Sequence, residues 1–193
     1  MKRRFVTTTA GLAALALASL GLVPANADSE PTGHEAAIKA CSTVNPSQPV
    51  KVVNAVADGS GIGFSLVWLN DKDGNLWMCD ADTDGHVYSY TIVKSDLLDG
   101  AGAELIGLQL ASDGTYDGQP QQIAEKVCVA YLSEGGSLVG SVADGLDADP
   151  GFVVFVKDGS DQLYLCNATG DAAVWAFEAV GDPITFDGKP ENS

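Results

Sequence analysis

The spacing of four cysteines constrains this chain more than any other feature. Cys41 and Cys79 are 38 positions apart, and Cys128 and Cys166 are also 38 positions apart. Four cysteines allow three pairings, and an even count is typical of disulfides in an extracellular chain. Equal spacing favours the pairs Cys41–Cys79 and Cys128–Cys166 if the chain contains an internal duplication.

A duplication is visible in the residues between and after these cysteines. A shift of 87 positions aligns WLNDKDGNLWMC (68–79) with FVKDGSDQLYLC (155–166), and DADTDGHVYSY (80–90) then falls on NATGDAAVWAF (167–177). The sequence therefore predicts two copies of one unit, at residues 28–120 and 121–193, with an extra stretch at about 94–114 in the first copy. Each copy is expected to close its own disulfide, which contributes about 4 kcal/mol in the chain-entropy model.

Each copy has the pattern of a short helix followed by four strands. Thr32 and Glu35 form a capping-box pattern before AAIKAC. Pro120 suits a first helical position before QQIAEKVC, although the valines and the tyrosine that follow also allow a strand. Turns rich in Gly, Asp and Asn separate the strand segments, which predicts an antiparallel meander. These segments are VKVVNAVA, GFSLVWL, NLWMC and HVYSYTIV in the first copy, and SLVGSVA, GFVVFV, QLYLC and AVWAFEAV in the second.

The predicted fold class is α+β, mainly antiparallel β. It consists of two tandem pseudo-repeats, each a short helix plus a four-stranded meander closed by one disulfide. The second strands are nearly continuous apolar runs, so we expect them to lie centrally with both faces covered, one of them by the helix. The sheet of the other copy is the candidate for the other face, and the sequence leaves open whether the repeats form one core or two. This arrangement resembles the layout of the beta-lactamase inhibitory proteins. The resemblance implies an inhibitor-type function and assigns no residue.

The first 27 residues have the pattern of a signal peptide. Lys2, Arg3 and Arg4 precede the apolar run GLAALALASLGLV, and Ala25-Asn26-Ala27 fits a cleavage site. Without these residues the chain has seven lysines, no arginine and 26 acidic residues, which gives a net charge of −19. Such a surface repels nucleic acids and anionic lipids, and no later segment is long and apolar enough to be a membrane anchor. We therefore expect a secreted protein that binds an extracellular protein or a carbohydrate, in an oligomeric state that the sequence leaves open.

The segment CDADTDGHVYSY contains Asp80, Asp82, Asp84 and Gly85 in the order of a calcium loop. A complete EF-hand loop would have a bidentate acid at position 91, which is Thr91 here, and would be flanked by helices rather than by predicted strands. The matching loop of the second copy has the same length but a single acid. A calcium site at Asp80, Asp82 and Asp84 is one interpretation, and a hairpin turn built from Asp and Gly is the other. No further cofactor is predicted.

No catalytic site is predicted from the nucleophile and base patterns. His34 and His86 are the only histidines of the chain, and His86 falls on Ala173 in the other copy. No G-x-S-x-G elbow is present, and no C-x-x-C motif or nearby histidine indicates redox or metal chemistry at the cysteines. Because acids are numerous, a carboxylate pair of the glycosidase type is the alternative.

Aromatic residues occupy matching positions in the two copies. The pairs are Trp68 with Phe155, Trp77 with Tyr164, Tyr88 with Trp175, and Tyr90 with Phe177. Because alternate residues of a strand share a face, Tyr88 and Tyr90 are expected to point together, and Trp77 to point with Cys79. Matched aromatics beside a buried disulfide favour a core, and the alternatives are a platform for sugar rings or a protein-binding surface.

These features predict a secreted, disulfide-stabilised, non-catalytic protein of the binding or inhibitor type. The alternatives are a secreted hydrolase that uses carboxylates and a calcium-assisted adhesion or structural protein. The insertion at 94–114 occurs in the first copy only, which makes it the candidate for copy-specific function. Within it, Leu97, Leu98 and Leu105 are the predicted partner-binding residues.

Overall fold

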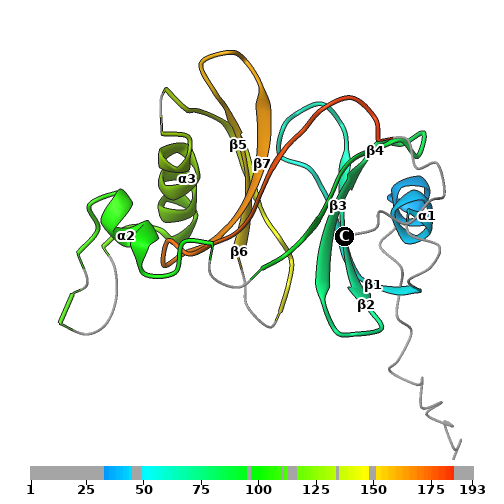
Figure 1. Ribbon diagram of the computed structural model, residues 1–193, viewed down its shortest axis with the longest axis horizontal. Coiled ribbons are helices and arrows are strands. Elements are labelled where there is room, and N and C mark those ends of the chain that lie inside the picture. The colour runs from blue at the N-terminus through cyan, green and yellow to red at the C-terminus, as the bar shows by residue number, and fades with distance from the viewer. Residues whose placement is uncertain are drawn as a thin grey trace, which may run out of the picture. The chain divides into compact units, whose positions relative to one another are not determined.

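The computed structural model describes residues 33–44, 49–94, 97–109, 111–112, 117–133, 135–147 and 151–184. Figure 1 shows two helix-and-sheet units in tandem. The elements of the first unit are α1 (Glu35–Thr43), β1 (Val50–Ala57), β2 (Ser65–Asp71), β3 (Leu76–Ala81) and β4 (Val87–Ile92). Those of the second are α3 (Pro120–Tyr131), β5 (Ser137–Ala143), β6 (Gly151–Lys157), β7 (Leu163–Thr169) and β8 (Val174–Ala179). A short helix, α2 (Ala101–Leu105), lies in the insertion between them.

The predicted α+β class with two antiparallel meanders is confirmed. The strands are hydrogen-bonded in the orders β1-β2-β3-β4 and β5-β6-β7-β8, and every pairing is antiparallel. The segment QQIAEKVC is helical, with Pro120 at the start of α3 as its sequence position predicts. The predicted signal peptide at residues 1–27 lies outside the described residues.

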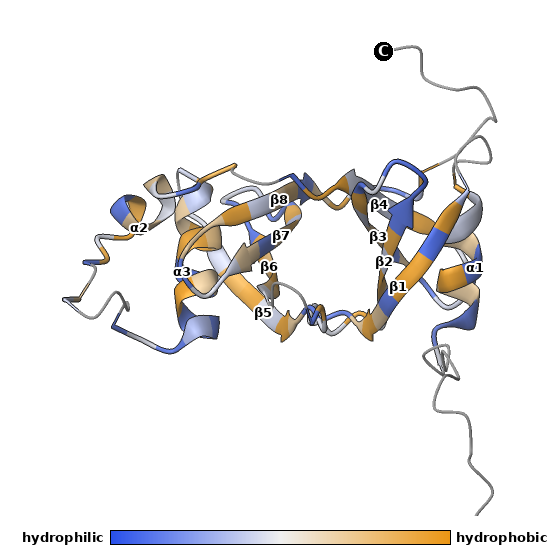
Figure 2. Cartoon of the chain, turned by 90° about the horizontal axis from the view of Figure 1, so that it is seen from below, coloured by the Kyte–Doolittle hydropathy of each residue, from blue (hydrophilic) through white to orange (hydrophobic). Residues whose placement is uncertain are grey.

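Helices and sheets are arranged in four layers, in the order α1, first sheet, second sheet, α3 (Figure 2). Alternation along the strands directs one set of apolar side chains toward the helix and the other toward the opposite sheet. On β2, Val67 and Leu69 pack under α1, whereas Leu66 and Trp68 pack against the second sheet. The inter-sheet cluster therefore joins the two units in one core, which settles a point that the sequence left open.

One disulfide fixes each helix to the third strand of its own sheet. Cys41 of α1 bonds Cys79 of β3, and Cys128 of α3 bonds Cys166 of β7, with a Cα–Cα distance of 6.0 Å in both. Both bridges close loops with a sequence separation of 38. The pairing predicted from the equal spacing is thus confirmed.

The two sheets also meet along their edges. At one edge the backbone N–H of Lys94 donates to the Trp175 carbonyl at 2.9 Å. At the other edge Asn54 Nδ2 donates to the Asp144 carbonyl at 3.1 Å. Here Gly140 of β5 approaches Gly59 so closely that a Cβ at position 140 would lie 2.1 Å from the Gly59 carbonyl oxygen. Only glycine fits this contact, which brings the end of β1 beside β5.

The face of Tyr88 and the start of α1 differ from the sequence-based predictions, which are wrong at both places. Tyr88 packs with the inter-sheet cluster and Tyr90 with the cluster under α1. The cause is a β-bulge in β4, where Tyr88 is the extra residue between the partners of Asp80 and Ala81. The expected common face of the two tyrosines is therefore absent. The capping box is also misplaced, since α1 begins at Glu35, whose carboxylate accepts from the Gly33 N–H at 3.2 Å. Thr32 lies outside the described residues.

Replacing Gly140 with alanine tests the close edge contact. The new Cβ would collide with a backbone carbonyl that no side-chain rotation can move, so we expect the free energy of unfolding to fall by about 2 kcal/mol or more. Gly159→Ala is the matched control, because no atom lies within 4 Å of a Cβ at that position. Urea denaturation of both variants measures the difference. Equal stability of the two variants would contradict the close approach.

Candidate functional site

The acidic loop predicted to hold calcium forms the turn between β3 and β4. Asp82 Oδ1 accepts hydrogen bonds from the backbone N–H groups of Asp84 at 2.9 Å and His86 at 2.8 Å. The N–H of Gly85 donates to the Asp82 carbonyl at 3.1 Å, and Gly85 has φ of 85°, a left-handed conformation that favours glycine. The side chain of the first residue thus organises a tight hairpin.

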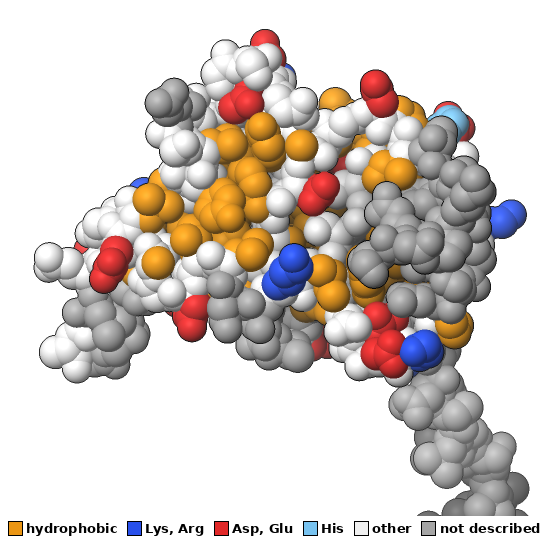
Figure 3. Space-filling model, in the orientation of Figure 1, with side chains coloured by type: hydrophobic (Ala, Val, Ile, Leu, Met, Phe, Trp, Pro, Cys, Tyr) orange, Lys and Arg blue, Asp and Glu red, His pale blue; other side chains and the backbone are white. Residues whose placement is uncertain are grey.

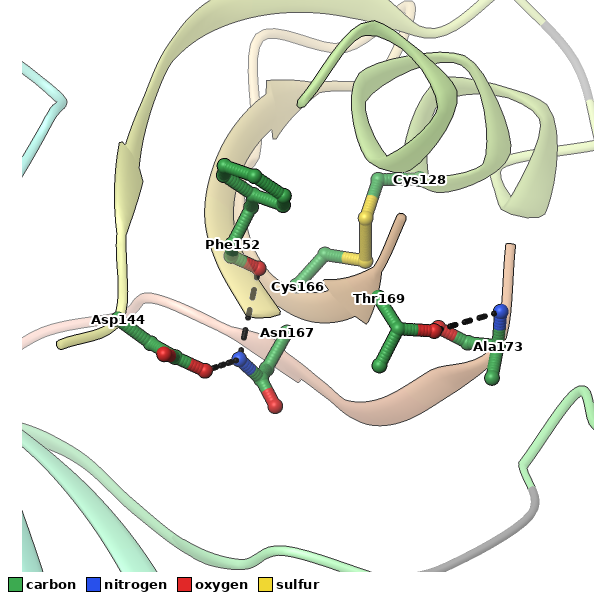
Figure 4. The surroundings of a disulfide bond; sticks show 7 residues. All are labelled: Cys128, Asp144, Phe152, Cys166, Asn167, Thr169 and Ala173. Atoms are coloured by element: carbon green, nitrogen blue, oxygen red, sulfur yellow. Dashed lines mark hydrogen bonds between the residues drawn. A yellow bond between two sulfur atoms is a disulfide. The ribbon is translucent and has the colours of Figure 1, made fainter. Parts of the chain in front are cut away.

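The same turn occurs at three other hairpins of the molecule. In each, the side chain of the first residue accepts from the backbone N–H four positions later, at 2.9–3.1 Å. The first residues of these turns are Asp71, Asp158 and Thr169, and Figure 4 shows the bond between Thr169 and Ala173. Because Thr169 aligns with Asp82 under the 87-position shift, the turn geometry belongs to the repeat. The D-x-D-G order in the first copy therefore has a structural explanation in hairpin formation.

A group of potential metal ligands nevertheless forms at this turn. One ligand atom each from Asp82, Asp84 and His86 can lie within 4.8 Å of the others. Asp82 Oδ2 lies 3.0 Å from His86 Nδ1 and accepts from the Tyr88 hydroxyl at 3.2 Å. Partial burial raises the pKa of Asp82, but these hydrogen bonds and those to the backbone lower it overall. The structure brings two of the three predicted calcium ligands together with His86, and the calcium site stays a prediction.

Asp80, the third predicted ligand, is buried in the inter-sheet layer. Its neighbours Cys79 and Ala81 point toward α1, so Asp80 points toward the second sheet, with 1% of its surface exposed. Ser89 faces it on β4, and neither side chain has a hydrogen-bond partner among the described residues. Burial raises the pKa of Asp80 to about 8, and the negative charges of Asp58 and Asp82 add to the effect.

In the second copy, the side chain at the same buried position has hydrogen-bond partners. Asn167, which aligns with Asp80, donates from Nδ2 to Asp144 Oδ2 at 3.2 Å and to the Phe152 carbonyl at 3.4 Å (Figure 4). Asp144 reaches Asn167 beside Gly151, where a Cβ would lie 2.9 Å from Asp144 Oδ2. The 87-position shift already pairs Asp80 with Asn167, so the sequence contained the signal for this buried polar position.

In the first copy, Phe64 stands where the second copy has Gly151. The Phe64 ring stacks on Tyr88 with ring centroids 4.6 Å apart. Asp58 corresponds to Asp144 because VADG occurs at 56–59 and again at 142–145, one position out of step with the 87-position shift. Asp58 instead accepts from the Ser60 hydroxyl at 2.8 Å. The carboxyl of Asp80 therefore lacks the partner that its counterpart has, which explains why its protonated form is favoured.

Stacked aromatic rings lie on the helix-facing side of both sheets. Trp77 stacks on Tyr90 with centroids 4.9 Å apart, and the corresponding Tyr164 and Phe177 are 5.2 Å apart. Tyr131, at the end of α3, lies 4.5 Å from Phe177 and completes a group that we call the aromatic trio (Tyr131, Phe177, Tyr164). All three rings are half-buried. Figure 3 shows hydrophobic side chains gathered on the face that carries β8 and α3.

The three leucines predicted to bind a partner have different environments. Leu97 and Leu105 are 37% and 49% exposed, whereas Leu98 packs against the core cluster under α3. The insertion itself covers the second unit, because a Cβ at Gly102 of α2 would lie 1.8 Å from the Ala172 carbonyl oxygen. Part of the insertion therefore serves packing, and Leu97 and Leu105 remain available to a partner.

Comparisons with known proteins give one partial likeness. No family model matches the chain, and no solved structure matches it. The outer membrane protein assembly factor BamB of Nitrosomonas eutropha (strain DSM 101675 / C91 / Nm57) is 28% identical over 156 residues, which are 78% of this chain and 36% of that protein. The chain thus spans about a third of the length of this curated relative.

Within the described ranges, no helix has the length and apolar character needed to cross a membrane. The two disulfides are compatible with an extracellular protein, because such bonds persist in oxidising compartments.

Replacing Asp71 tests the role of the turn carboxylates. Asp71 Oδ2 accepts from Asn75 Nδ2 at 2.9 Å and Trp77 Nε1 at 3.0 Å, and these bonds lower its pKa to about 2. A lowered pKa stabilises the folded state above pH 4, and this contribution is lost as the pH falls toward 2. Asp71→Ala should therefore lower the melting temperature at pH 6 and have a smaller effect at pH 2.5.

The neighbouring Asp73 provides the control for this variant. It is exposed and pairs with Lys72 at 2.7 Å on the surface, so Asp73→Ala should leave the melting temperature nearly unchanged. Equal losses in the two variants would show that Asp71 has no special role in the turn.

Replacing Asp80 with asparagine tests the buried carboxyl. In the folded protein Asp80 stays protonated up to about pH 8, whereas the unfolded chain releases this proton near pH 4. Its contribution to the stability of the native chain therefore becomes less favourable as the pH rises from 4 to 8. Asp80→Asn should remove this decline and raise the free energy of unfolding at pH 8 by about 2–5 kcal/mol, with little change at pH 4.

Asp84→Asn, in the exposed part of the same hairpin, is the control for charge removal. Denaturant titrations of the three proteins from pH 4 to pH 8 give the comparison. The same pH dependence in the native protein and in Asp80→Asn would contradict a protonated Asp80.

Proposed function

We propose that the mature chain is a secreted, non-catalytic binding protein of the inhibitor type that captures an extracellular macromolecule. The observation that carries this proposal is the aromatic trio in the second unit. Hydrophobic side chains also gather on the face that carries β8 and α3 (Figure 3). Half-buried aromatic rings on a surface supply large contact area at low entropic cost, and clustered apolar surface is typical of interaction sites.

Broken symmetry supports a role for this face beyond folding. The first unit has Trp77 and Tyr90 at the corresponding positions, but Val44, which corresponds to Tyr131, is buried in the core. At the end of the helix, the first copy thus has a small, buried valine, whereas the second copy has a tyrosine that reaches the surface. Leu97 and Leu105 add exposed apolar side chains to the second unit.

The roles of the polar side chains agree with a non-catalytic function. Asp71, Asp82 and Asp158 hold hairpin turns through hydrogen bonds to their own backbone. His86 lies against Asp82, and His34 Nδ1 lies 2.7 Å from Ser65 Oγ. The partial likeness to a protein named as an assembly factor is consistent with a binding role. The acidic charge of the mature chain favours a basic partner.

A capture experiment with surface variants tests the proposal. The purified protein is immobilised and incubated with spent culture medium, with and without calcium, and captured proteins are quantified by mass spectrometry. Tyr131→Ser and Leu105→Ser should each reduce a specific captured protein at least tenfold, because an apolar contact at an interface centre is lost. Ile62→Ser is the control, since Ile62 is 54% exposed in the first unit.

Capture that is unchanged in both Tyr131→Ser and Leu105→Ser would contradict binding through this face. Capture that depends on calcium and is lost in Asp84→Asn would instead favour the calcium-assisted alternative.

A further inference from the structure

A shallow, open depression of about 550 Å³ lies at the start of α3. We call it the α3 depression, and it is distinct from the aromatic trio, which includes the last residue of the same helix. The residues that line it are Gln119, Pro120, Gln121, Gln122, Glu125 and Phe152.

The fold holds the walls of the α3 depression in fixed positions. Pro120 packs against the β7–β8 turn so closely that a Cβ at Gly170 would lie 2.5 Å from the Pro120 Cβ. The Cys128–Cys166 bridge fixes α3 to β7, and the Phe152 ring lies on the same side of the sheet as this bridge (Figure 4). A surface held by a disulfide and by backbone packing loses little freedom when a ligand binds.

Among the described residues, the first unit carries a different side chain at the position of Phe152. Ser65 occupies the position of Phe152 under the 87-position shift, and its hydroxyl lies 2.7 Å from His34 Nδ1 at the start of α1. The first copy thus places a serine that contacts a histidine at this position, whereas the second copy places a half-buried aromatic ring there. The start of α3 makes its polar contact to the sheet elsewhere, from Gln121 Nε2, which donates to Ser141 Oγ on β5 at 2.6 Å. The two copies thus differ at a residue that lines the depression, while the helix and strands around it are the same in both.

The chemistry of the lining indicates a neutral ligand with many hydroxyl groups. Three glutamine amides supply both donors and acceptors. Glu125 accepts from the Ser141 hydroxyl at 2.6 Å and has a second carboxylate oxygen to accept from a ligand. The first turn of α3 has no side-chain cap, so its backbone N–H groups can donate as well. No lysine or arginine lines the depression, and Glu125 repels anions.

We propose that the α3 depression binds a neutral saccharide, with a sugar ring on Phe152 and its hydroxyl groups on the amides of Gln121 and Gln122 and on Glu125. This inference rests on the proposed binding function and names a second ligand class at a different surface. Sugar rings combine an apolar face with a rim of hydroxyl groups, and this combination matches one aromatic ring surrounded by amides and one carboxylate.

Isothermal titration calorimetry of the disulfide-intact protein with defined oligosaccharides tests the proposal. The probes are cellohexaose and chitohexaose, both neutral, and hexagalacturonate, which is anionic. At least one neutral hexasaccharide should release or absorb heat on binding, and hexagalacturonate should bind at least tenfold more weakly. Absence of heat with both neutral probes at millimolar concentration would overturn the proposal.

Two variants locate the site. Gln122→Ala removes an exposed amide, and Phe152→Leu keeps an apolar side chain but removes the ring face; each should weaken saccharide binding at least tenfold. Gln109→Ala is the matched control, because Gln109 is also exposed but lies outside the depression. If Phe152→Leu fails to fold, the test rests on Gln122→Ala alone. Saccharide binding by Gln122→Ala as strong as that of the native protein would overturn the assignment of the site.

The outcome separates this proposal from the proposed protein-binding function. Loss of saccharide binding in Gln122→Ala with unchanged protein capture supports two separate sites. Failure of saccharide binding with intact, Tyr131-dependent capture overturns the saccharide site alone.

Discussion

Face-to-face packing of the two sheets is the interaction on which the rest of the structure depends. Trp68 and Phe155 occupy matching positions on the central strands, and both are fully buried between the sheets. A unit of about 70 residues alone buries too little apolar surface for high stability. Joining two such units through a shared core removes one exposed face from each sheet. The disulfides then fasten each outer helix to the third strand of its own sheet.

Much of the fold could be predicted because duplication gives two independent observations of each element. The equal cysteine spacing selected one of three disulfide pairings, and the aligned apolar segments located the eight strands that occur among the described residues. The faces of Tyr88 and Tyr90 could not be predicted, because a single bulged residue inverts the alternation beyond it and leaves no mark in the hydrophobic pattern. The exposure of Tyr131 could not be predicted either, because it depends on where α3 ends relative to β8, which the hydrophobic pattern does not show.

The differences between the copies are most informative at buried positions. Asp80 and Asn167 share one place in the fold, and the presence of Phe64 or Gly151 beside them decides whether a neighbouring aspartate can reach it. An amide that donates to a carboxylate has a hydrogen-bond partner and can be buried at little cost. A buried carboxyl without a partner avoids the cost of a buried charge because it stays protonated. Sequence alignment of the copies identifies the position, but the raised pKa depends on burial and on Asp58 and Asp82, which only the three-dimensional arrangement brings near.

The calcium-like motif illustrates how one side chain can satisfy two patterns. A carboxylate at the first position of a tight hairpin accepts backbone N–H groups from the residues two and four positions later, and a glycine at the next-to-last position adopts the left-handed conformation. This requirement alone generates D-x-D-G when the intervening position is also acidic, as at Asp82 and at Asp71. Asp71 begins such a turn without the contact to a histidine that Asp82 makes, so the motif also occurs where no group of potential metal ligands forms among the described residues. A cation at the β3–β4 turn would therefore have to compete with the hydrogen bonds that Asp82 already makes in the hairpin. The carboxylate of Asp84 holds no part of the turn, so it is the side chain that is available to bind a cation.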